Sequence, residues 1–256
     1  DKLSSEKSEK NGPYDQEGPV GVKSELTQSQ TEPVAVNSEL TLKKAVVIAS
    51  GSSLELSGVL DVLTRYDKKD VGILVADRSL LDVIKKGITP DKFPFFYTCL
   101  NENIITKAGH DLLPDFFLHP EIYPITKEIT LFYNQLLEER RMEVLNMLGF
   151  QMRKFNRFGK GPAPGPEIKT GGNCGMALIE IGRHILKIDK VGFIGLDLDH
   201  SESWKTKPDL NELVLTRSQL IDDLVKTGKN VFSLTRLGNV HGKGIEETNI
   251  HAFLKD

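Results

Sequence analysis

Residues 43–63, KKAVVIASGSSLELSGVLDVL, carry the clearest signal for the fold of this chain. Residues 45–49 form an apolar, β-branched run without alternation, which is typical of a strand buried on both faces of a parallel sheet. Small residues follow at once, and apolar residues then recur at roughly helical spacing from Leu54 to Leu63. The stretch therefore predicts a buried strand, a tight turn and a helix.

The turn at residues 50–53 has two interpretations. Its four members are Ser50, Gly51, Ser52 and Ser53. Small residues between a strand and a helix let the backbone approach a ligand, and the first helical N–H groups suit a phosphate. Alternatively, the segment is only a tight turn with a serine cap. Neither GxGxxG nor GxxxxGK[ST] is present, so the two interpretations stay open.

Composition and charge limit the class of protein. A chain of 256 residues with 39% hydrophobic and 27% charged residues is ordinary for a soluble globular protein with one large α/β domain. No apolar run reaches the roughly 20 residues of a membrane span, and the charged first residues predict no signal peptide, hence a cytoplasmic protein. The net charge of −3 gives no reason to expect nucleic acid as a partner.

The two cysteines, Cys99 and Cys174, are far apart and lack the spacing of metal ligands. We expect them to be reduced, partly buried thiols. A structural zinc site and a disulfide scaffold are not predicted.

Residues 1–41 differ from the rest of the chain. They are rich in Ser, Glu, Gln and Pro and carry four lysines against eight acidic residues. Such a segment buries too little apolar surface to offset its chain entropy. The sequence predicts a disordered or loosely attached polar arm at 1–41 and one domain over 42–256.

Strands and helices are predicted to alternate through this domain. Further strands are expected at 71–76, 93–98, 116–119, 190–200 and 231–234, and helices at 80–84, 126–148, 174–186 and 208–226. Alternation of this kind calls for an α/β fold. We therefore predict a Rossmann-like, doubly wound, mainly parallel sheet with helices on both faces.

Ligands of open α/β sheets bind at the carboxyl ends of the strands, near the point where strand order reverses. Besides the 50–53 turn, the residues predicted at those ends are Asp77, Asn101, Gly171, Gly172, Asn173, Asp197, Asp199 and His200. Asp77 either binds a ribose hydroxyl or caps the next helix. The glycine-rich segment 171–173 could face the same pocket as the 50–53 turn and hold a nucleotide with it.

Two carboxylates and a histidine close the strand that begins at residue 190. Asp197 and Asp199 share a face of that strand and could hold Mg²⁺, although one of them could equally cap a loop. The adjoining carboxylates suit His200 to acid or base chemistry, and a plain surface histidine is the alternative. The basic, Gly- and Pro-rich segment 151–169 reads as a solvated loop or as a lid whose cations meet an anionic substrate.

Several of these segments resemble the 6-hydroxymethylpterin diphosphokinase-like family, which includes proteins similar to the motility accessory factor glycosyltransferases. The segments are ASGSSL, ADRSLLDVIKKGITPD, GGNCGMALIEIGRHILKIDKVGFIGLDLD and LTRLGNVHGKGIEETNIHAFL, so the resemblance covers about residues 43–254 without the middle. Two motifs depart from the archaeal pterin enzymes. Their Asp-Leu-Asp-Gly is Cys99-Leu100-Asn101-Glu102 here, and their Asp-Gly-Asp-Arg is Asn173-Cys174-Gly175-Met176.

The segment at residues 96–102, FYTCLNE, is closer to the bacterial CMP-sialic acid-dependent sialyltransferases, whose fold is related. These resemblances imply a nucleotide-binding transferase, foremost a glycosyltransferase using a nucleotide-activated sugar. The 50–53 turn and 171–173 would hold phosphates, Asp77 and Asn101 ribose or base, and His200 with Asp197 would be catalytic. The alternatives are an ATP- and Mg²⁺-dependent pterin diphosphokinase, with Asp197 and Asp199 as metal ligands, and a non-catalytic nucleotide-binding module.

Overall fold

The computed structural model describes residues 42–100, 115–134, 137, 139–157, 166–168, 173–197, 219, 222, 224–226, 230–238, 240 and 244–255. The chain divides into two units, Asp1–Ser38 and Glu39–Asp256, and all described residues belong to the second. The arm predicted at 1–41 lies outside the described residues.

The described strands form one parallel sheet in the order β6-β5-β4-β3-β2-β1-β7-β8-β9. Their bounds are β1 Lys44–Ile48, β2 Val71–Ala76, β3 Phe95–Leu100, β4 Ile129–Asn134, β5 Gln151–Arg157, β6 Glu167–Ile168, β7 Lys190–Ile194, β8 Val231–Ser233 and β9 Glu246–Glu247. The chain builds outward from β1 to β6, then returns to place β7 on the other side of β1. Strand order therefore reverses between β1 and β7, and the predicted doubly wound α/β fold is confirmed.

Strand β1 lies at the centre because it pairs on both edges and is covered on both faces. Lys44 is in register with Val71 of β2 and with Lys190 of β7. Residues 45–48 are all fully buried. This double burial explains why the strand's sequence does not alternate between apolar and polar residues.

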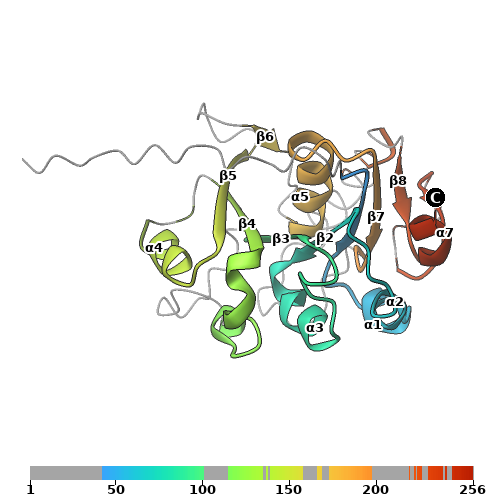
Figure 1. Ribbon diagram of the computed structural model, residues 1–256. Helices are drawn as coiled ribbons and strands as arrows, with labels where there is room; N and C mark the ends of the chain where they lie inside the picture. The colour runs from blue at the N-terminus through green and yellow to red at the C-terminus, as the bar shows by residue number, and fades with distance from the viewer. Residues whose placement is uncertain are drawn as a thin grey trace, which may run out of the picture. The chain divides into compact units, whose positions relative to one another are not determined.

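Helices cover both faces of the sheet (Figure 1). The α-helices are α1 Ser53–Leu56, α2 Val59–Leu63, α3 Leu80–Lys85, α4 Glu139–Met147, α5 Cys174–Glu180 and α7 Ile250–Lys255. Short 3-10 helices are η1 Asp77–Ser79, η2 Asp115–Leu118 and η3 Tyr123–Glu128, and a π-helical turn, η4 Ile181–Ile185, continues α5.

Successive residues of the strands enter two separate apolar clusters. Val46 and Ile48 of β1 face the cluster formed with α1, α2, α3, α4 and α7. Val47 faces the other cluster, which α5 covers. Figure 1 shows α5 on one side of the sheet and α1, α3 and α4 on the other. The alternating side chains of buried strands thus produce two cores, one per face.

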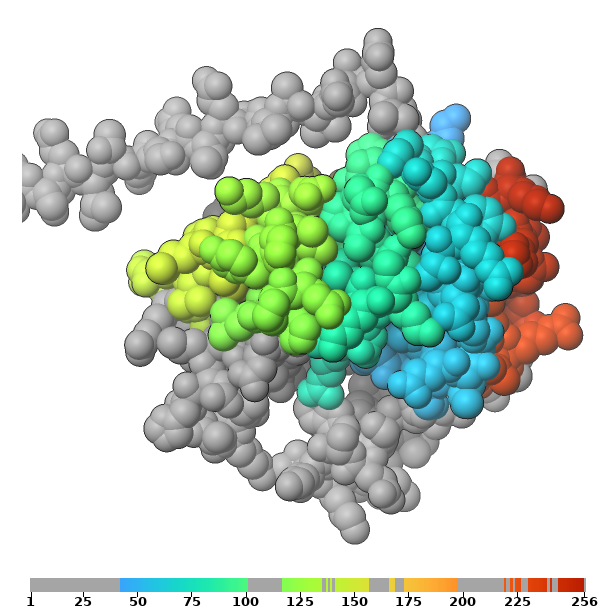
Figure 2. Space-filling model, turned by 60° about the horizontal axis from the view of Figure 1, so that its bottom comes forward, coloured from blue at the N-terminus to red at the C-terminus, as the bar shows by residue number. Residues whose placement is uncertain are grey.

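The C-terminal helix returns to the N-terminal part of the domain. Figure 2 shows the red C-terminal segment beside the blue segment that follows β1, as the strand order requires. Lys44 Nζ donates a hydrogen bond to the Phe253 carbonyl at 3.2 Å, and the Tyr66 hydroxyl lies 2.7 Å from His251 Nδ1. Helix α7 therefore secures the start of β1 and the end of α2.

The long helix predicted at 126–148 is wrong in its first half. Residues 126–128 belong to the 3-10 helix η3, residues 129–134 (ITLFYN) form β4, which pairs with β3 and β5, and among the described residues of this segment the α-helix covers Glu139–Met147. Ile129, Leu131 and Phe132 are fully buried. Their β-branched and aromatic neighbours favour a pleated strand, and burial on both faces outweighs the helical spacing seen in the sequence.

Two shorter predictions in the middle of the chain are also wrong. Residues 116–118 of the strand expected at 116–119 belong to the 3-10 helix η2, in which Phe117 packs edge-on against Phe150 with ring centroids 5.4 Å apart. The loop expected at 151–169 contains β5 and β6. Its basic residues Arg153 and Lys154 are exposed on β5, because charged side chains are tolerated near the edge of a sheet.

Candidate functional site

The 50–53 turn lies at the carboxyl end of β1, where strand order reverses. Beyond the strand ladder, the chain stays tied to the end of β7. The Ala49 amide donates to the Ile194 carbonyl at 2.9 Å, and the Gly51 amide donates to the Gly195 carbonyl at 2.7 Å. The turn is therefore held against the segment that carries Asp197.

Asp197 accepts hydrogen bonds from this turn with both carboxylate oxygens. The Ser53 amide donates to Oδ2 at 2.6 Å, and the Ser52 hydroxyl donates to the same oxygen at 3.3 Å. The Ser53 hydroxyl donates to Oδ1. Asp197 is only 3% exposed. Its carboxylate therefore lies, buried, at the start of α1, where the sequence predicted that a ligand phosphate could bind.

Glycines make this close approach possible. A Cβ on Gly51 would lie 2.5 Å from both the Gly195 carbonyl oxygen and Asp197 Oδ2. Gly238, with a left-handed φ of 85°, also brings its Cα against the Asp197 carboxylate. Gly51 is therefore required by packing within the protein, whether or not a ligand binds there.

Asp77 is buried at the end of β2, with 3% of its surface exposed. Its Oδ1 accepts a hydrogen bond from the Arg78 amide at 2.8 Å, within the first turn of η1. Of the two roles expected for this residue, the described contacts are those of a carboxylate that stabilises the start of a helix.

Asn173 caps α5, since its Oδ1 accepts a hydrogen bond from the Met176 amide at 3.2 Å. The first turn of α5 packs tightly against the ends of β1 and β7. A Cβ on Gly175 would lie 2.8 Å from Ala49 Cβ and from Leu196 Cδ1. The start of α5 therefore lies against the carboxyl ends of β1 and β7, while Gly171 and Gly172 of the segment predicted to face the 50–53 turn lie outside the described residues.

The two thiols meet beside this edge, and both are free. Cys174 Sγ donates a hydrogen bond to the Cys99 carbonyl at 3.1 Å. The pKa of Cys174 is raised well above its ordinary value by hydrogen bonding with the Cys99 side chain, then by burial and by the negative charge of Asp77. Cys174 is therefore a protonated thiol at neutral pH.

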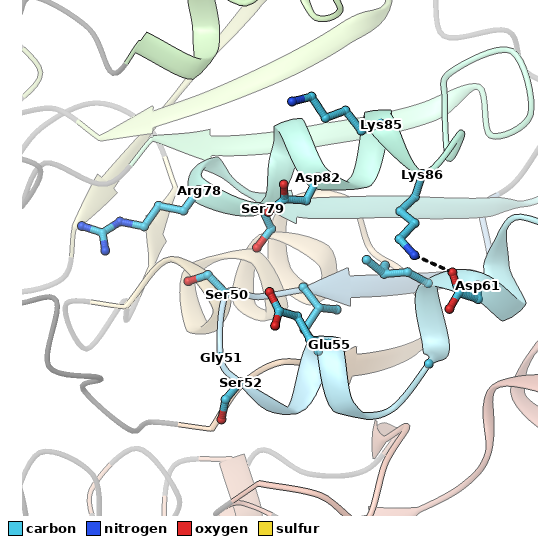
Figure 3. Close-up of a pocket in the computed structure, with 13 residues that line it drawn as sticks. Ser50, Gly51, Ser52, Glu55, Asp61, Arg78, Ser79, Asp82, Lys85 and Lys86 are labelled. Carbon is cyan, nitrogen blue, oxygen red and sulfur yellow. Dashed lines mark hydrogen bonds and ion pairs between the residues drawn. The ribbon is translucent and has the colours of Figure 1, made fainter.

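A pocket of about 750 Å³ opens beside the 50–53 turn (Figure 3). It lies between the α1–α2 segment and the η1–α3 segment, so it borders the carboxyl ends of β1 and β2. Its lining residues are Ser50, Gly51, Ser52, Leu54, Glu55, Gly58, Leu60, Asp61, Arg78, Ser79, Asp82, Lys85 and Lys86. A volume of this size suits a ligand as large as a nucleotide.

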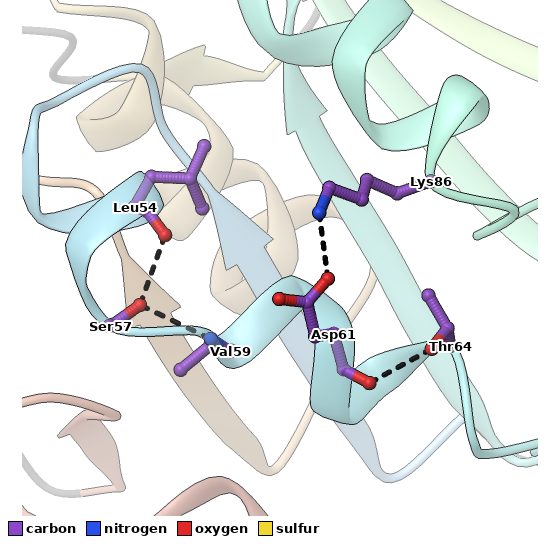
Figure 4. A network of polar contacts seen from close by, with 6 residues as sticks. All are labelled: Leu54, Ser57, Val59, Asp61, Thr64 and Lys86. Carbon is purple, nitrogen blue, oxygen red and sulfur yellow. Dashed lines mark hydrogen bonds and ion pairs between the residues drawn. The ribbon is translucent and has the colours of Figure 1, made fainter.

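The pocket carries balanced charge. Three cationic and three acidic side chains line it. One pair is already joined, because Lys86 Nζ lies 2.7 Å from Asp61 Oδ1 (Figure 4). In the same network the Ser57 hydroxyl bridges the Leu54 carbonyl and the Val59 amide, which fixes the bend between α1 and α2.

The pocket brings together some of the predicted site residues and not others. Ser50, Gly51 and Ser52 line it, whereas Ser53, Asp77, Asn173 and Asp197 are described but are not among its lining residues. The other predicted site residues lie outside the described part of the chain, and they are Asn101, Gly171, Gly172, Asp199 and His200.

Sequence reasoning missed Arg78 and Ser79, which also line the pocket. They follow Asp77 directly after β2. Their position at a strand end, the rule already applied to Asp77, could have identified them.

The described residues do not offer a metal site. None of their His, Cys, Asp and Glu side chains form a group of three or more that could hold a metal ion. Both oxygens of Asp197 accept hydrogen bonds from Ser52 and Ser53, so Mg²⁺ at this residue would share the carboxylate with these donors.

The fold and the pocket define an α/β protein with a doubly wound parallel sheet and a cavity at its carboxyl edge. No family model matches the chain, and no similar curated protein or solved structure was found. The resemblance to the 6-hydroxymethylpterin diphosphokinase-like family stays a prediction. Over the described residues, no helix has the length and apolar character needed to cross a membrane.

Proposed function

We propose that the chain is a nucleotide-binding transferase that uses a nucleotide-activated sugar as donor. The observation that carries this proposal is the position of the pocket, which borders the carboxyl ends of β1 and β2 beside the β1/β7 reversal point. Nucleotides bind open α/β sheets at this edge because the loops after the strands and the starts of the following helices converge there.

The pocket offers complementary groups for such a ligand. Leu54 and Leu60 give its floor an apolar surface for a base or sugar face. The hydroxyl of Ser50 and the guanidinium of Arg78 provide donors for ribose and phosphate oxygens. The mixture of an apolar surface with a few polar groups is typical of a small-molecule site.

In the proposed reaction, the bond between the anomeric carbon and the donor phosphate oxygen breaks, and an acceptor oxygen bonds to that carbon. The acceptor hydroxyl loses its proton to a base, for which His200 is the candidate. The nucleotide leaves with the electron pair of the broken bond, so cations beside its phosphate lower the barrier. Positioning of donor and acceptor supplies the rest of the acceleration.

A pocket-filling variant tests the assignment. Calorimetric titration with UDP-glucose, GDP-mannose and CMP-sialic acid should give saturable binding of at least one donor to the parent chain, with and without EDTA. Ser50→Trp places a large side chain at an exposed lining position and should abolish that binding. Asp70→Trp is the control, because Asp70 is exposed just before β2, at the opposite edge of the sheet.

Three results would redirect the proposal. Binding of ATP only in the presence of Mg²⁺ would favour the diphosphokinase alternative. Donor binding with neither transfer to an acceptor nor hydrolysis by water would favour a non-catalytic nucleotide-binding module. Full binding by Ser50→Trp would show that the pocket is not the donor site.

A further inference from the structure

We infer that Arg78, and not the 50–53 turn, contacts the phosphate of the bound nucleotide. This inference rests on the proposed function and assigns the phosphate to one end of the same pocket. The conventional expectation for a doubly wound fold is the opposite, because the turn after the first strand usually holds the phosphate.

The first reason is that donors of Ser52 and Ser53, at the start of α1, are already engaged. The Ser53 amide and the Ser52 and Ser53 hydroxyls donate to Asp197. A phosphate in that position would have to displace a buried carboxylate from its hydrogen bonds. It would also have to tolerate that negative charge nearby in a poorly solvated environment, where like charges repel strongly.

The second reason is the distribution of cations along the pocket. Lys85 and Lys86 lie at the end of α3, where Lys86 pairs with Asp61 at 2.7 Å, whereas Arg78 follows directly after β2. Figure 3 shows this pair at one end of the pocket and Arg78 at the other, on the same side as Ser50 and Ser52. Arg78 is therefore the cation closest to the sheet edge at which the phosphate of a nucleotide is expected.

The third reason is the chemistry of the side chain and its support. A guanidinium presents a planar fork of N–H donors that matches two phosphate oxygens at once. The backbone of Arg78 is fixed by its amide, which donates to Asp77 Oδ1 at 2.8 Å. The buried Asp77 thus positions the backbone of Arg78 and is not among the pocket's lining residues. With the phosphate at Arg78, the nucleoside would extend between α2 and α3.

Matched pairs of ligands separate the phosphate from the nucleoside. We would measure the dissociation constants of UDP and uridine, CDP and cytidine, GDP and guanosine, and ADP and adenosine by calorimetry. Arg78→Ala should weaken the bound diphosphate about 10- to 100-fold, as expected for loss of a charge-assisted hydrogen bond, and leave its nucleoside unchanged. Arg78→Lys should recover part of the loss.

Two controls make the result specific. Arg65→Ala removes an exposed arginine that does not line the pocket and should leave both constants unchanged. The thermal midpoint of each variant without ligand reports whether the fold is intact. Equal weakening of diphosphate and nucleoside by Arg78→Ala would indicate a structural role and would overturn the inference.

Different binding results would overturn the inference and the proposed function. If the parent chain binds a diphosphate and Arg78→Ala binds it equally well, the phosphate lies elsewhere and the proposed function stands. If the parent chain binds none of the eight ligands, nucleotide binding itself is wrong and the inference falls with it.

Discussion

The backbone N–H of Ser53 lies 2.6 Å from Oδ2 of Asp197, although 144 residues separate the two in sequence. This contact joins the loop after β1 to the loop after β7, the two strands between which strand order reverses. An internal carboxylate thus occupies the position where a doubly wound fold usually receives a ligand phosphate. Ser53 therefore has a structural role through Asp197, whereas Ser50, Gly51 and Ser52 of the same turn line the pocket.

Asp197→Ala should lower the free energy of unfolding by about 3 kcal/mol, because it leaves the buried Ser53 amide and hydroxyl without their acceptor. Urea denaturation followed by circular dichroism measures this loss. Asp61→Ala is the matched control, since its ion pair with Lys86 is exposed and should contribute less than about 1 kcal/mol. A loss for Asp197→Ala no larger than that of the control would contradict the contact.

Gly51→Ala should destabilise the chain by about 2 kcal/mol or more. Its Cβ would meet the Gly195 carbonyl oxygen at 2.5 Å, and backbone atoms at a strand end cannot move aside cheaply. Gly182→Ala provides the comparison, because the nearest atoms to its Cβ lie at 3.5 Å. That variant should gain up to about 1 kcal/mol by favouring helix, and the thermal midpoints should therefore shift in opposite directions.

Cys174 should react slowly with iodoacetamide at neutral pH, because its raised pKa keeps the thiol protonated. The midpoint of the rate against pH should lie well above the ordinary value of 9.0, and Cys99→Ala should lower it by removing the largest cause of the shift. Mass spectrometry of the labelled peptide reads the rate. A midpoint at or below 9.0 in the parent chain would refute the assignment.

The raised pKa of Cys174 also makes the free energy of unfolding depend on pH. A thiol whose pKa is raised by folding stabilises the native state fully below the unfolded pKa, and this contribution is lost as pH rises through the folded pKa. The window therefore lies above about pH 9. The free energy of unfolding of Cys174→Ser should fall less steeply across that window than that of the parent.

The central part of the fold could be predicted from the sequence because burial on both faces leaves a direct signal. Residues 45–49 and 71–76 are continuous apolar runs, and each is followed by small or acidic residues that end the strand. The error at 126–148 arose where β-branched and aromatic residues also recur at helical spacing. Only pairing with β3 and β5, which is a tertiary interaction, decides that segment.

The site could be predicted only in part, for a related reason. The rule that ligands lie at strand ends selected Ser50 and Ser52, which line the pocket, and Asp197, which does not. The hydrogen bonds between Asp197 and the turn depend on a contact across most of the domain, and local sequence carries no signal for it. Arg78 also follows the end of a predicted strand, so the same rule could have selected it.

Nucleotide binding by the parent chain is best measured with a thermal-shift series using CMP, CDP, UDP, GDP, ATP and GTP, each with and without Mg²⁺. A ligand at 100 times its dissociation constant stabilises the native state by about 2.7 kcal/mol, which raises the melting temperature visibly. We predict a rise with at least one pyrimidine nucleotide in the absence of metal, and no rise with that nucleotide in Ser50→Trp. The absence of any shift across the series would contradict nucleotide binding and leave the 50–53 turn as a purely structural feature.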